Sequence, residues 1–361
     1  MKTRLIRVYG KDDVVVAAKK RIVSLYTNNT FVYVSFSGGK ESLAMAHLIF
    51  ELYEDDKIDI TKTRVVFIDE EAIYPDVEKI VKLYRKKFLK IGATFYWLCL
   101  PVKHFNCFNL LYNDESFICW DMAQKENWIR EIPKYAMTSH PLLKLGETYQ
   151  EFLAKIHDGP MLIGLRAAES FQRLKVLSSQ TNQMKTKDNK VYPIYDWSLN
   201  DTWYFILDRN IPIPEAYIYM WKVGVSVSQL RISQFFSIDT ARSLVKMFEF
   251  YPDLYEKILK REPNAYLAMM YWDSDMFRRN TSSGKDKDGN SENSVSDIKK
   301  ASYAGLTEFR KRDAQHAKQL ESFLTTKGSD LTDAGWKVVL EIVTAGDPKG
   351  RTIRRLYTMM K

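Results

Sequence analysis

The stretch VYVSFSGGKESLAMAHLIFEL, residues 32–52, passes from an apolar, β-rich run directly into a helical pattern. The change falls on Ser37, Gly38, Gly39 and Lys40. Glycines let backbone N–H groups converge without a Cβ in the way, and the N-terminus of a following helix adds unpaired N–H groups. The stretch therefore predicts a strand, a loop suited to phosphate, and a helix. A plain helix cap at Ser37 is the alternative reading of the same residues.

The residues that follow repeat this alternation. Strand patterns at 63–69 and 93–101 are separated by helical patterns at 41–56 and 74–92, and PMLIGL at 160–165 reads as a fourth strand. Strands that alternate with helices predict a parallel sheet covered by helices on both faces. Ligands of such sheets bind at the carboxyl ends of the strands, so the position of the loop favours phosphate over a plain cap.

The remaining segments divide the chain into predicted regions. A helix is expected at 12–27 and another at 200–210, with an extended piece at 190–197 and a proline-containing loop at 211–217. The polar, Gly/Ser-rich run near residue 285 is typical of a linker or mobile loop. The predicted regions are a nucleotide-binding domain at 1–240, a helical extension at 241–279, a linker at 280–299 and a small basic helical region at 300–361.

Charge favours anionic partners. The 361-residue chain has a formal net charge of +9 and a pI near 9.1, which suits nucleotides, nucleic acid or an acidic protein. From Lys300 onward it holds 12 Lys and Arg against 7 Asp and Glu, a net charge of +5. These charges are interpreted either as a DNA or RNA contact or as solvated helix surfaces, and both readings stay open.

Composition also bounds the compartment and the class of protein. The chain is 45% hydrophobic, enough for a sizeable core, and it has three cysteines, an odd count that argues against a secreted disulfide scaffold. The first 13 residues lack the apolar region of a signal peptide. No run approaches the roughly 20 apolar residues of a membrane span. We therefore expect a cytoplasmic protein without a membrane partner.

Four motifs in order carry a resemblance to a known family. SFSGGKES, residues 35–42, matches neither the Walker A nor the Rossmann pattern but resembles the PP-loop of the ATP pyrophosphatase superfamily. Residues 66–77, 164–170 and 193–217 (VFIDEEAIYPDV, GLRAAES and PIYDWSLNDTWYFILDRNIPIPEAY) resemble motifs of the phosphoadenosine phosphosulfate (PAPS) reductase family. The resemblance implies an α/β fold of the adenine nucleotide alpha hydrolase type: a doubly wound, mostly parallel sheet with a helical C-terminal extension.

A looser resemblance points to a narrower branch. Residues 95–109, the segment Cys119 to Pro133 and the tail around Trp336 resemble the IbrA-like proteins. Members of that branch often lie beside a ParB-like nuclease-domain protein, so the resemblance implies such a protein as a partner. The sequence leaves a homo-oligomeric state open.

The resemblance also implies a site. Its ligand is ATP or a PAPS-like adenine nucleotide with Mg²⁺, and a pyrophosphate leaving group rests on the loop. Asp69, at the end of the second strand, is expected to face the cleft and contact the nucleotide or a water of Mg²⁺, with a helix-capping or loop carboxylate as the alternative. Glu41 stands where the family usually has Asp, so its carboxylate reaches one methylene further. The catalytic residues are predicted to be Lys40, Asp69 and Arg166, and the nucleotide-binding residues Ser37, Gly38, Gly39, Lys40, Glu41, Ser42, Asp69, Gly164, Arg166, Glu169 and Arg173.

Other residues of the family motifs allow more than one interpretation. Asp196 and Trp197 are expected to close the cleft, with a place in the core as the alternative for Trp197. For Arg173 the alternative is a surface ion pair.

The reductase chemistry of the family is not expected. PAPS reductases attack their substrate with a cysteine thiolate on a C-terminal segment, and here no cysteine follows Cys119. The favoured function is an enzyme that cleaves ATP to AMP and pyrophosphate to activate or modify a nucleic-acid or nucleotide substrate. The alternatives are a regulator that binds ATP or PAPS without turnover, and a sulfate adenylyltransferase-like activity.

A metal site at the cysteines is the weaker reading of their spacing. Cys99, His104, Cys107 and Cys119 supply ligand types that zinc accepts, but their spacing matches no standard zinc site. Cys99 falls in a predicted buried strand, where a free cysteine behaves as a small hydrophobe. We therefore expect Cys99 to be a buried thiol, and a metal at the four residues stays open as the weaker alternative.

Overall fold

The computed structural model contains two compact units, Met1–Thr281 and Ser282–Lys361. It describes residues 11–109, 116–169, 188–232, 235–237, 246–271, 295–345 and 351–359. Within these residues, none of the helices is both long and apolar enough to cross a membrane.

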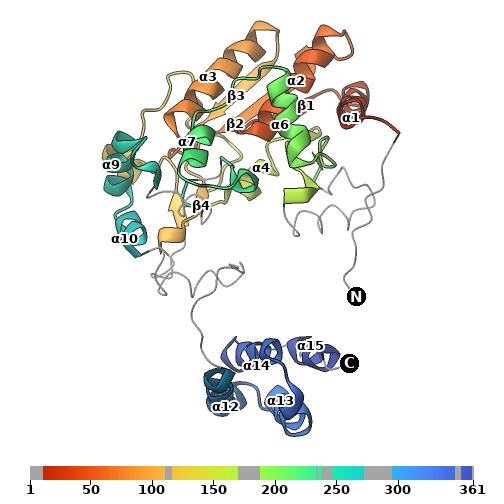
Figure 1. Cartoon of the computed structure of the whole chain (residues 1–361). Coiled ribbons are helices and arrows are strands. Elements are labelled where there is room, and N and C mark those ends of the chain that lie inside the picture. Colours follow the sequence, from red (N-terminus) through yellow and green to blue (C-terminus); the bar gives the residue numbers. More distant parts are fainter. Residues whose placement is uncertain are drawn as a thin grey trace. The chain divides into compact units, whose positions relative to one another are not determined.

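The first unit is built on a five-stranded parallel sheet (Figure 1). In spatial order the strands are β3 (Thr94–Leu98), β2 (Thr63–Ile68), β1 (Val32–Ser35), β6 (Met161–Ile163) and β7 (Lys190–Val191). Each neighbouring pair is parallel, so all the carboxyl ends lie at one edge. The predicted α/β class with a mostly parallel sheet is confirmed.

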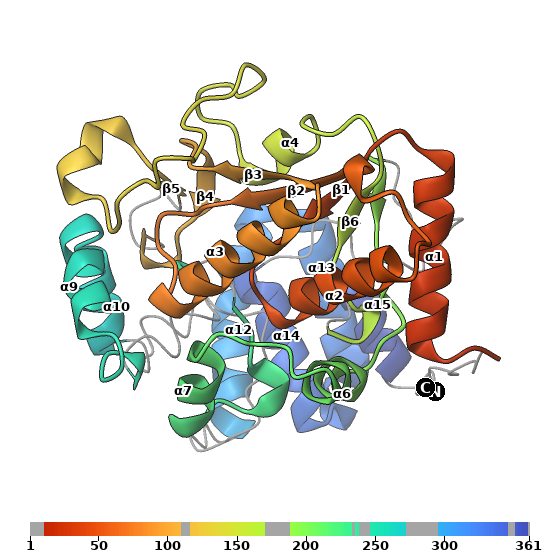
Figure 2. The ribbon, with the colours of Figure 1, turned by 90° about the horizontal axis from the view of Figure 1, so that it is seen from above.

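Helices cover the sheet on both faces. Figure 2 shows α2 (Lys40–Glu54) and α3 (Pro75–Lys90) on one side of the strands, and α4 (Tyr149–Leu153) on the other. Pro75 opens α3, with acidic residues in its first turn and Lys87 and Lys90 in its last, an arrangement that suits the helix dipole. Other helices of this unit are α1 (Val14–Asn28), α6 (Leu199–Asp208), α7 (Ala216–Lys222), α9 (Pro252–Arg261) and α10 (Asn264–Tyr271).

The sheet buries different side chains on its two faces. Register places Val34 beside Val65, and Val65 beside Phe95, on the face toward α2 and α3. Alternation places Ser35 beside Val66 on the opposite face. Because both faces are covered, the strands read as nearly continuous apolar runs, as the sequence indicated.

One element had no clear signal in the sequence. An antiparallel pair, β4 (Lys103–Phe105) and β5 (Ser116–Ile118), pairs His104 with Phe117 in a region that the sequence predicted only as irregular. Three-residue strands are too short for a periodic pattern to identify them.

Two buried carboxylates after β2 hold distant segments of the first unit together. Glu71 is fully buried and adopts a left-handed backbone with φ of 65°. Its carboxylate accepts hydrogen bonds from Trp120 N at 2.7 Å and from Arg261 Nε at 2.9 Å. Asp69, also fully buried, accepts from Trp97 Nε1 at 2.9 Å and pairs with Arg130. Every charge in this cluster therefore has a partner, as buried charges require.

The second unit is a set of helices with its own core. Its helices are α12 (Val295–Arg312), α13 (Ala314–Lys327), α14 (Asp333–Ala345) and α15 (Arg351–Met359). Helix α12 begins inside the segment that the sequence assigned to a linker, because residues 295–299 already belong to its first turns. The core contains Phe309, Leu320, Phe323, Trp336, Ile342 and Leu356, which supports the predicted helical region around Trp336.

The Glu71–Arg261 pair gives a test of the fold. Replacing Glu71 with Ala leaves a buried guanidinium without its carboxylate, so we expect the free energy of unfolding to fall by about 3–5 kcal/mol. Urea denaturation of the full chain measures this change. The control is Lys20→Ala, which removes an exposed ion pair with Asp12 and is expected to cost less than about 1 kcal/mol. Equal losses in the two variants would contradict the structural role of Glu71.

Candidate functional site

The loop between β1 and α2 turns sharply at Gly38. The φ of Gly38 is 76°, in the left-handed region that favours glycine. A Cβ at this position would lie 3.0 Å from Val81 and 3.2 Å from Val77, so α3 also excludes a side chain here. Ser42 Oγ donates to Gly39 O at 2.9 Å and tightens the first turn of α2. The loop is thus packed into a fixed shape at the carboxyl edge of the sheet.

The backbone N–H and the side-chain ammonium of Lys40 both donate hydrogen bonds to residues from a distant part of the chain. Its backbone N–H donates to Tyr217 Oη at 2.9 Å, and its Nζ donates to Leu230 O at 2.7 Å. The side chain is almost fully buried, and this burial lowers the pKa of the Lys40 ammonium, although the Glu41 carboxylate at 3.1 Å opposes the shift. The loop amide and the ammonium are therefore both positioned to bind an oxygen atom.

The motif that begins at Gly164 contacts the loop at Glu41. Arg166 Nε and Nη2 both donate to Glu41 Oε1 at 3.1 Å, and Nη2 also lies 3.3 Å from Glu169 Oε1. A Cβ on Gly164 would lie 2.8 Å from the carbonyl carbon of Glu41, so only glycine allows this approach. The structure thus brings together two motifs that are 125 residues apart in the sequence, and it places Glu169 beside Arg166. Arg173 lies outside the described residues.

Asp69 does not face the pocket, contrary to the prediction from the sequence. Its carboxylate is directed to Trp97, Arg130 and the backbone N–H of Glu71, and the side chain is fully buried. Side chains alternate along a strand, so Asp69 follows the face of Phe67, toward Trp97, while Glu70 follows the face of Ile68. The residue that lines the pocket at this strand end is Glu70.

Asp196 and Trp197 also lie away from the loop. Trp197 is fully buried and its Nε1 donates to Val14 O at 3.1 Å, while Asp196 forms an ion pair with Arg21. Both residues attach the motif to α1. The core alternative for Trp197 is therefore the one that the structure shows.

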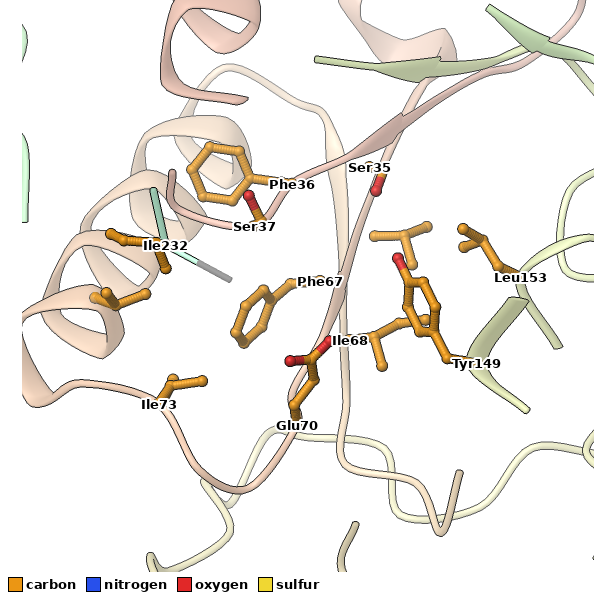
Figure 3. Close-up of a pocket in the computed structure, with 12 residues that line it drawn as sticks. Ser35, Phe36, Ser37, Phe67, Ile68, Glu70, Ile73, Tyr149, Leu153 and Ile232 are labelled. Carbon is orange, nitrogen blue, oxygen red and sulfur yellow. The ribbon is translucent and has the colours of Figure 1, made fainter. Parts of the chain in front are cut away.

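A pocket opens beside the loop at the ends of β1 and β2 (Figure 3). It contains about 570 Å³ of empty space, a volume that includes the solvent in its open mouth. In Figure 3, Ser37 and Glu70 stand at opposite ends, with Phe67 between them. The lining residues are Ser35, Phe36, Ser37, Val66, Phe67, Ile68, Glu70, Ile73, Val77, Tyr149, Leu153 and Ile232.

Sequence reasoning missed three of the polar side chains at this site. Tyr217 ends the proline-containing loop that the family resemblance singled out, but its contact with Lys40 spans 177 residues and left no local signal. Tyr149 comes from α4, in a region with irregular patterning. Glu70 could have been found, because alternation along β2 places it on the opposite face from Asp69.

The cysteines do not form a metal centre in the structure. Cys99, Cys107 and Cys119 are all buried, and burial raises the pKa of each thiol. Cys119 Sγ donates to Glu70 O at 3.4 Å. No group of three His, Cys, Asp or Glu side chains within the described ranges is placed to hold a metal ion. The cysteines are therefore neutral thiols in the protein interior, and the zinc alternative gains no support.

The contacts of the acidic side chains also show which of them could bind the predicted Mg²⁺. The carboxylate of Glu41 is engaged by Lys40 and Arg166, and that of Asp69 by Arg130. The described side chains thus offer no protein cage for Mg²⁺, which usually needs carboxylates and substrate phosphates together.

The close approach at Gly164 generates a prediction. Gly164→Ala forces its methyl group against the backbone of Glu41, so we expect a loss of about 1–3 kcal/mol in the free energy of unfolding. The control is Gly328→Ala, where the new Cβ would meet only ordinary contacts at 3.8 Å or more and the change should stay within about 1 kcal/mol. Urea denaturation of the full chain compares the two. A neutral Gly164→Ala would contradict the described packing of the motif on the loop.

Comparisons with known proteins agree with the motifs. The model of the phosphoadenosine phosphosulfate reductase domain matches residues 122–221, a range that contains Gly164, Arg166 and Glu169. The uncharacterized protein YbdN of Escherichia coli is 29% identical over 270 residues, which cover 68% of this chain and 64% of YbdN. Phosphoadenosine 5'-phosphosulfate reductase of Alteromonas mediterranea is 24% identical over 208 residues, 56% of this chain and 68% of the reductase.

A solved structure shows a more distant similarity. The U34-tRNA thiolase NcsA from Methanococcus maripaludis is 14% identical, with a TM-score of 0.32 over 75% of this chain and 80% of the thiolase. The match to YbdN leaves more than a third of that protein's own length uncovered. None of these matches bears on the IbrA-like branch, which stays a prediction. In its sequence, this chain is similar to phosphoadenosine phosphosulfate reductases, and the match to the model of their domain covers residues 122–221.

Proposed function

We propose that this protein binds ATP in the pocket beside the loop and cleaves it to AMP and pyrophosphate while activating or modifying a second substrate. The observation that carries the proposal is the loop from Ser37 to Ser42. It joins a strand end to a helix N-terminus, has a left-handed glycine, and sits against Arg166 of the third motif. The loop carries backbone N–H groups, two hydroxyls and the Lys40 ammonium, and Glu41 holds the Arg166 guanidinium beside it. These are groups of the kind that bind a pyrophosphate.

The proposed reaction assigns these residues roles in phosphate binding. A nucleophile of the second substrate attacks the α-phosphorus and becomes bonded to AMP, while the bond from phosphorus to the bridging oxygen breaks and pyrophosphate leaves with the electron pair. AMP leaves in a second step, when the group that modifies the activated substrate displaces it. Lys40, the hydroxyls of Ser37 and Ser42, and the loop amides stabilise the charge that develops on the leaving group. Arg166 adds a guanidinium beside them. Any Mg²⁺ would arrive bound to the phosphates and would neutralise part of their negative charge.

Asp69 enters the proposal as a positioning residue. Its carboxylate fixes the indole of Trp97 and the guanidinium of Arg130, and these contacts set the course of the chain after β2. The pocket wall at Glu70 and Ile73 lies on that segment.

The reaction is not proposed to be sulfur reduction. A reductase of this family needs a cysteine thiolate, and the three cysteines of this chain are buried with raised pKa values. The second substrate is proposed to be a nucleic acid or a nucleotide. Support comes from the net charge and from exposed lysines in the second unit, namely Lys311, Lys318, Lys327 and Lys337. A ParB-like nuclease-domain partner and a homo-oligomeric state remain proposals that the sequence alone motivates.

One observation favours a second candidate function, a regulator that binds ATP or PAPS without turnover. The loop donors are already satisfied within the protein, since Tyr217 Oη accepts from Lys40 N and Leu230 O accepts from Lys40 Nζ. Phosphate binding would exchange these contacts and release the segment around Leu230. A regulator could use such a release without chemistry, whereas an enzyme would use it to admit its substrate.

The proposed activity predicts a product. With labelled ATP, Mg²⁺ and a mixture of RNA and DNA, the wild-type protein should release AMP and pyrophosphate. Lys40→Ala removes the buried ammonium, and we expect the rate to fall about 10²- to 10³-fold. The control is Lys79→Ala, which removes an exposed lysine of α3 and should leave the rate unchanged.

Calorimetry on the same proteins separates the two candidate functions. ATP binding without AMP or pyrophosphate above the level of Lys40→Ala would contradict the enzyme and leave the regulator. Absence of both ATP and PAPS binding to the wild type would contradict both candidate functions.

Nucleic-acid binding by the second unit predicts a dependence on salt. Each lysine that contacts a phosphate contributes nearly one unit to the slope of log K against log salt concentration. We expect the triple variant Lys318→Ala, Lys327→Ala, Lys337→Ala to bind RNA or DNA more weakly and to reduce that slope by about 2–3 units. Fluorescence anisotropy between about 50 and 200 mM salt measures it. An unchanged slope would exclude these lysines from a nucleic-acid contact.

A further inference from the structure

Two oxygen atoms of the protein already occupy the donors that the loop would offer to a phosphate. The hydroxyl of Tyr217 accepts the backbone N–H of Lys40 at 2.9 Å, and the carbonyl oxygen of Leu230 accepts a hydrogen bond from the Lys40 ammonium at 2.7 Å. All three residues are buried. A phosphate oxygen that binds the Lys40 N–H therefore has to take the place of the Tyr217 hydroxyl.

The Tyr217 hydroxyl is held as proteins hold the oxygen of an anion. Besides the N–H of Lys40, the backbone N–H of Ile232 forms a hydrogen bond with it. Two backbone N–H groups that converge on one oxygen are the usual means of binding a phosphate or an oxyanion. A Cβ on Gly39 would lie 3.4 Å from the same hydroxyl, so the oxygen rests directly on the loop.

The segment that carries Leu230 and Ile232 is attached to the rest of the first unit mainly at its end. Residues 226–229 are exposed, and the hydrogen bonds described for them are local, such as Gln229 N to Ser226 O at 2.8 Å. Only at Leu230 and Ile232 does the segment reach the loop and the pocket (Figure 3). Exposed segments with local hydrogen bonds open at a low cost in free energy. We name residues 226–232 the strap.

We propose that the strap and the Tyr217 hydroxyl close the phosphate site of the free protein, and that the phosphates of an incoming ligand displace both. This inference rests on the proposed binding of phosphates at the loop. Displacement is favourable because a phosphate oxygen is charged whereas the hydroxyl and the carbonyl are neutral, and charge-assisted hydrogen bonds are roughly twice as strong. The Tyr217 hydroxyl is thus a competitor of the ligand and not one of the groups that bind it.

The closed state has a consequence for affinity. Only molecules with an open strap bind the ligand, so each hydrogen bond that stabilises the closed state weakens the apparent affinity. Tyr217→Phe removes the oxygen that accepts from Lys40 and keeps the ring, which packs edge-on against Trp203 at 5.5 Å. Loss of a neutral hydrogen bond changes an equilibrium by about threefold to tenfold. We therefore expect Tyr217→Phe to bind phosphates more tightly than the wild type by about this factor.

The test is calorimetric titration of the full chain with inorganic pyrophosphate and Mg²⁺. Pyrophosphate serves as the probe because it can occupy the loop without a base or a second substrate. The matched control is Tyr219→Phe, on the same helix, whose hydroxyl donates to Glu215 at 2.8 Å and not to the loop. Its affinity for pyrophosphate should equal that of the wild type. Circular dichroism and the urea midpoint verify that each variant is folded.

Hydrogen–deuterium exchange on the same proteins reports the strap itself. Without ligand, the amides of Lys40 and Ile232 should exchange faster in Tyr217→Phe than in the wild type, because their common acceptor is gone. In the wild type, saturating pyrophosphate should slow exchange at residues 38–42 and accelerate it at residues 226–232, because the strap loses its contact with Lys40.

Three results would overturn the proposal. Unchanged pyrophosphate affinity in Tyr217→Phe would show that the hydroxyl does not close the site. Weaker binding would make the hydroxyl a group that binds the ligand. Slower exchange of residues 226–232 with pyrophosphate would show that the strap closes over the ligand and is not displaced by it. Absence of pyrophosphate binding to both the wild type and Tyr217→Phe would instead contradict the proposed phosphate site, and binding by Tyr217→Phe alone would support a closed wild type.

Discussion

The buried pairing of Glu71 with Arg261 is the interaction on which the rest of the first unit depends. Glu71 sits in a left-handed backbone conformation, which costs a non-glycine residue of the order of 1–3 kcal/mol, and it is fully removed from water. Such a residue is stable only where fixed partners stabilise its buried charge and its backbone conformation. Here they are Arg261 and the backbone N–H groups of Trp120 and Ile129.

Two more buried carboxylates lie close to Glu71 in the sequence, Asp69 after β2 and Asp76 in the first turn of α3, and each one contacts a different segment. Asp69 holds Trp97 and Arg130. Asp76 accepts from Ala216 N at 2.6 Å and from Tyr251 Oη at 2.8 Å, which sets the start of α7 and thereby the position of Tyr217 on the loop. Residues 69–76 thus contact several distant segments, and the loop between β1 and α2 is itself held by Tyr217 and by Leu230, which lies 190 residues from Lys40.

The sequence predicts those elements of the structure that short, local patterns of residues determine. The change from an apolar run to a helix at Ser37–Lys40 fixes a strand, a loop and a helix, and alternation along the chain fixes a parallel sheet with its carboxyl ends together. The family resemblance assigned Gly164 and Glu41 to the same predicted site. The direct contact between them, which admits no Cβ on Gly164, is visible only in three dimensions.

The features that could not be predicted from the sequence depend on long-range partners. Asp69 and Glu70 are adjacent acids, and which of them faces the pocket depends on where Trp97 and Arg130 lie. Tyr217 has no local pattern that marks it as a partner of Lys40. Arg173 falls outside the described residues, so its role stays a prediction.

The central claim is that a nucleotide binds where the loop meets the pocket. Hydrogen–deuterium exchange of the full chain with and without ATP tests it most directly, because it reports the backbone amides without any substitution. The account predicts slower exchange at residues 37–42 and 66–73, with altered exchange around Leu230 as its contact with Lys40 is replaced. Protection confined to other segments, or no protection at saturating ATP, would contradict it.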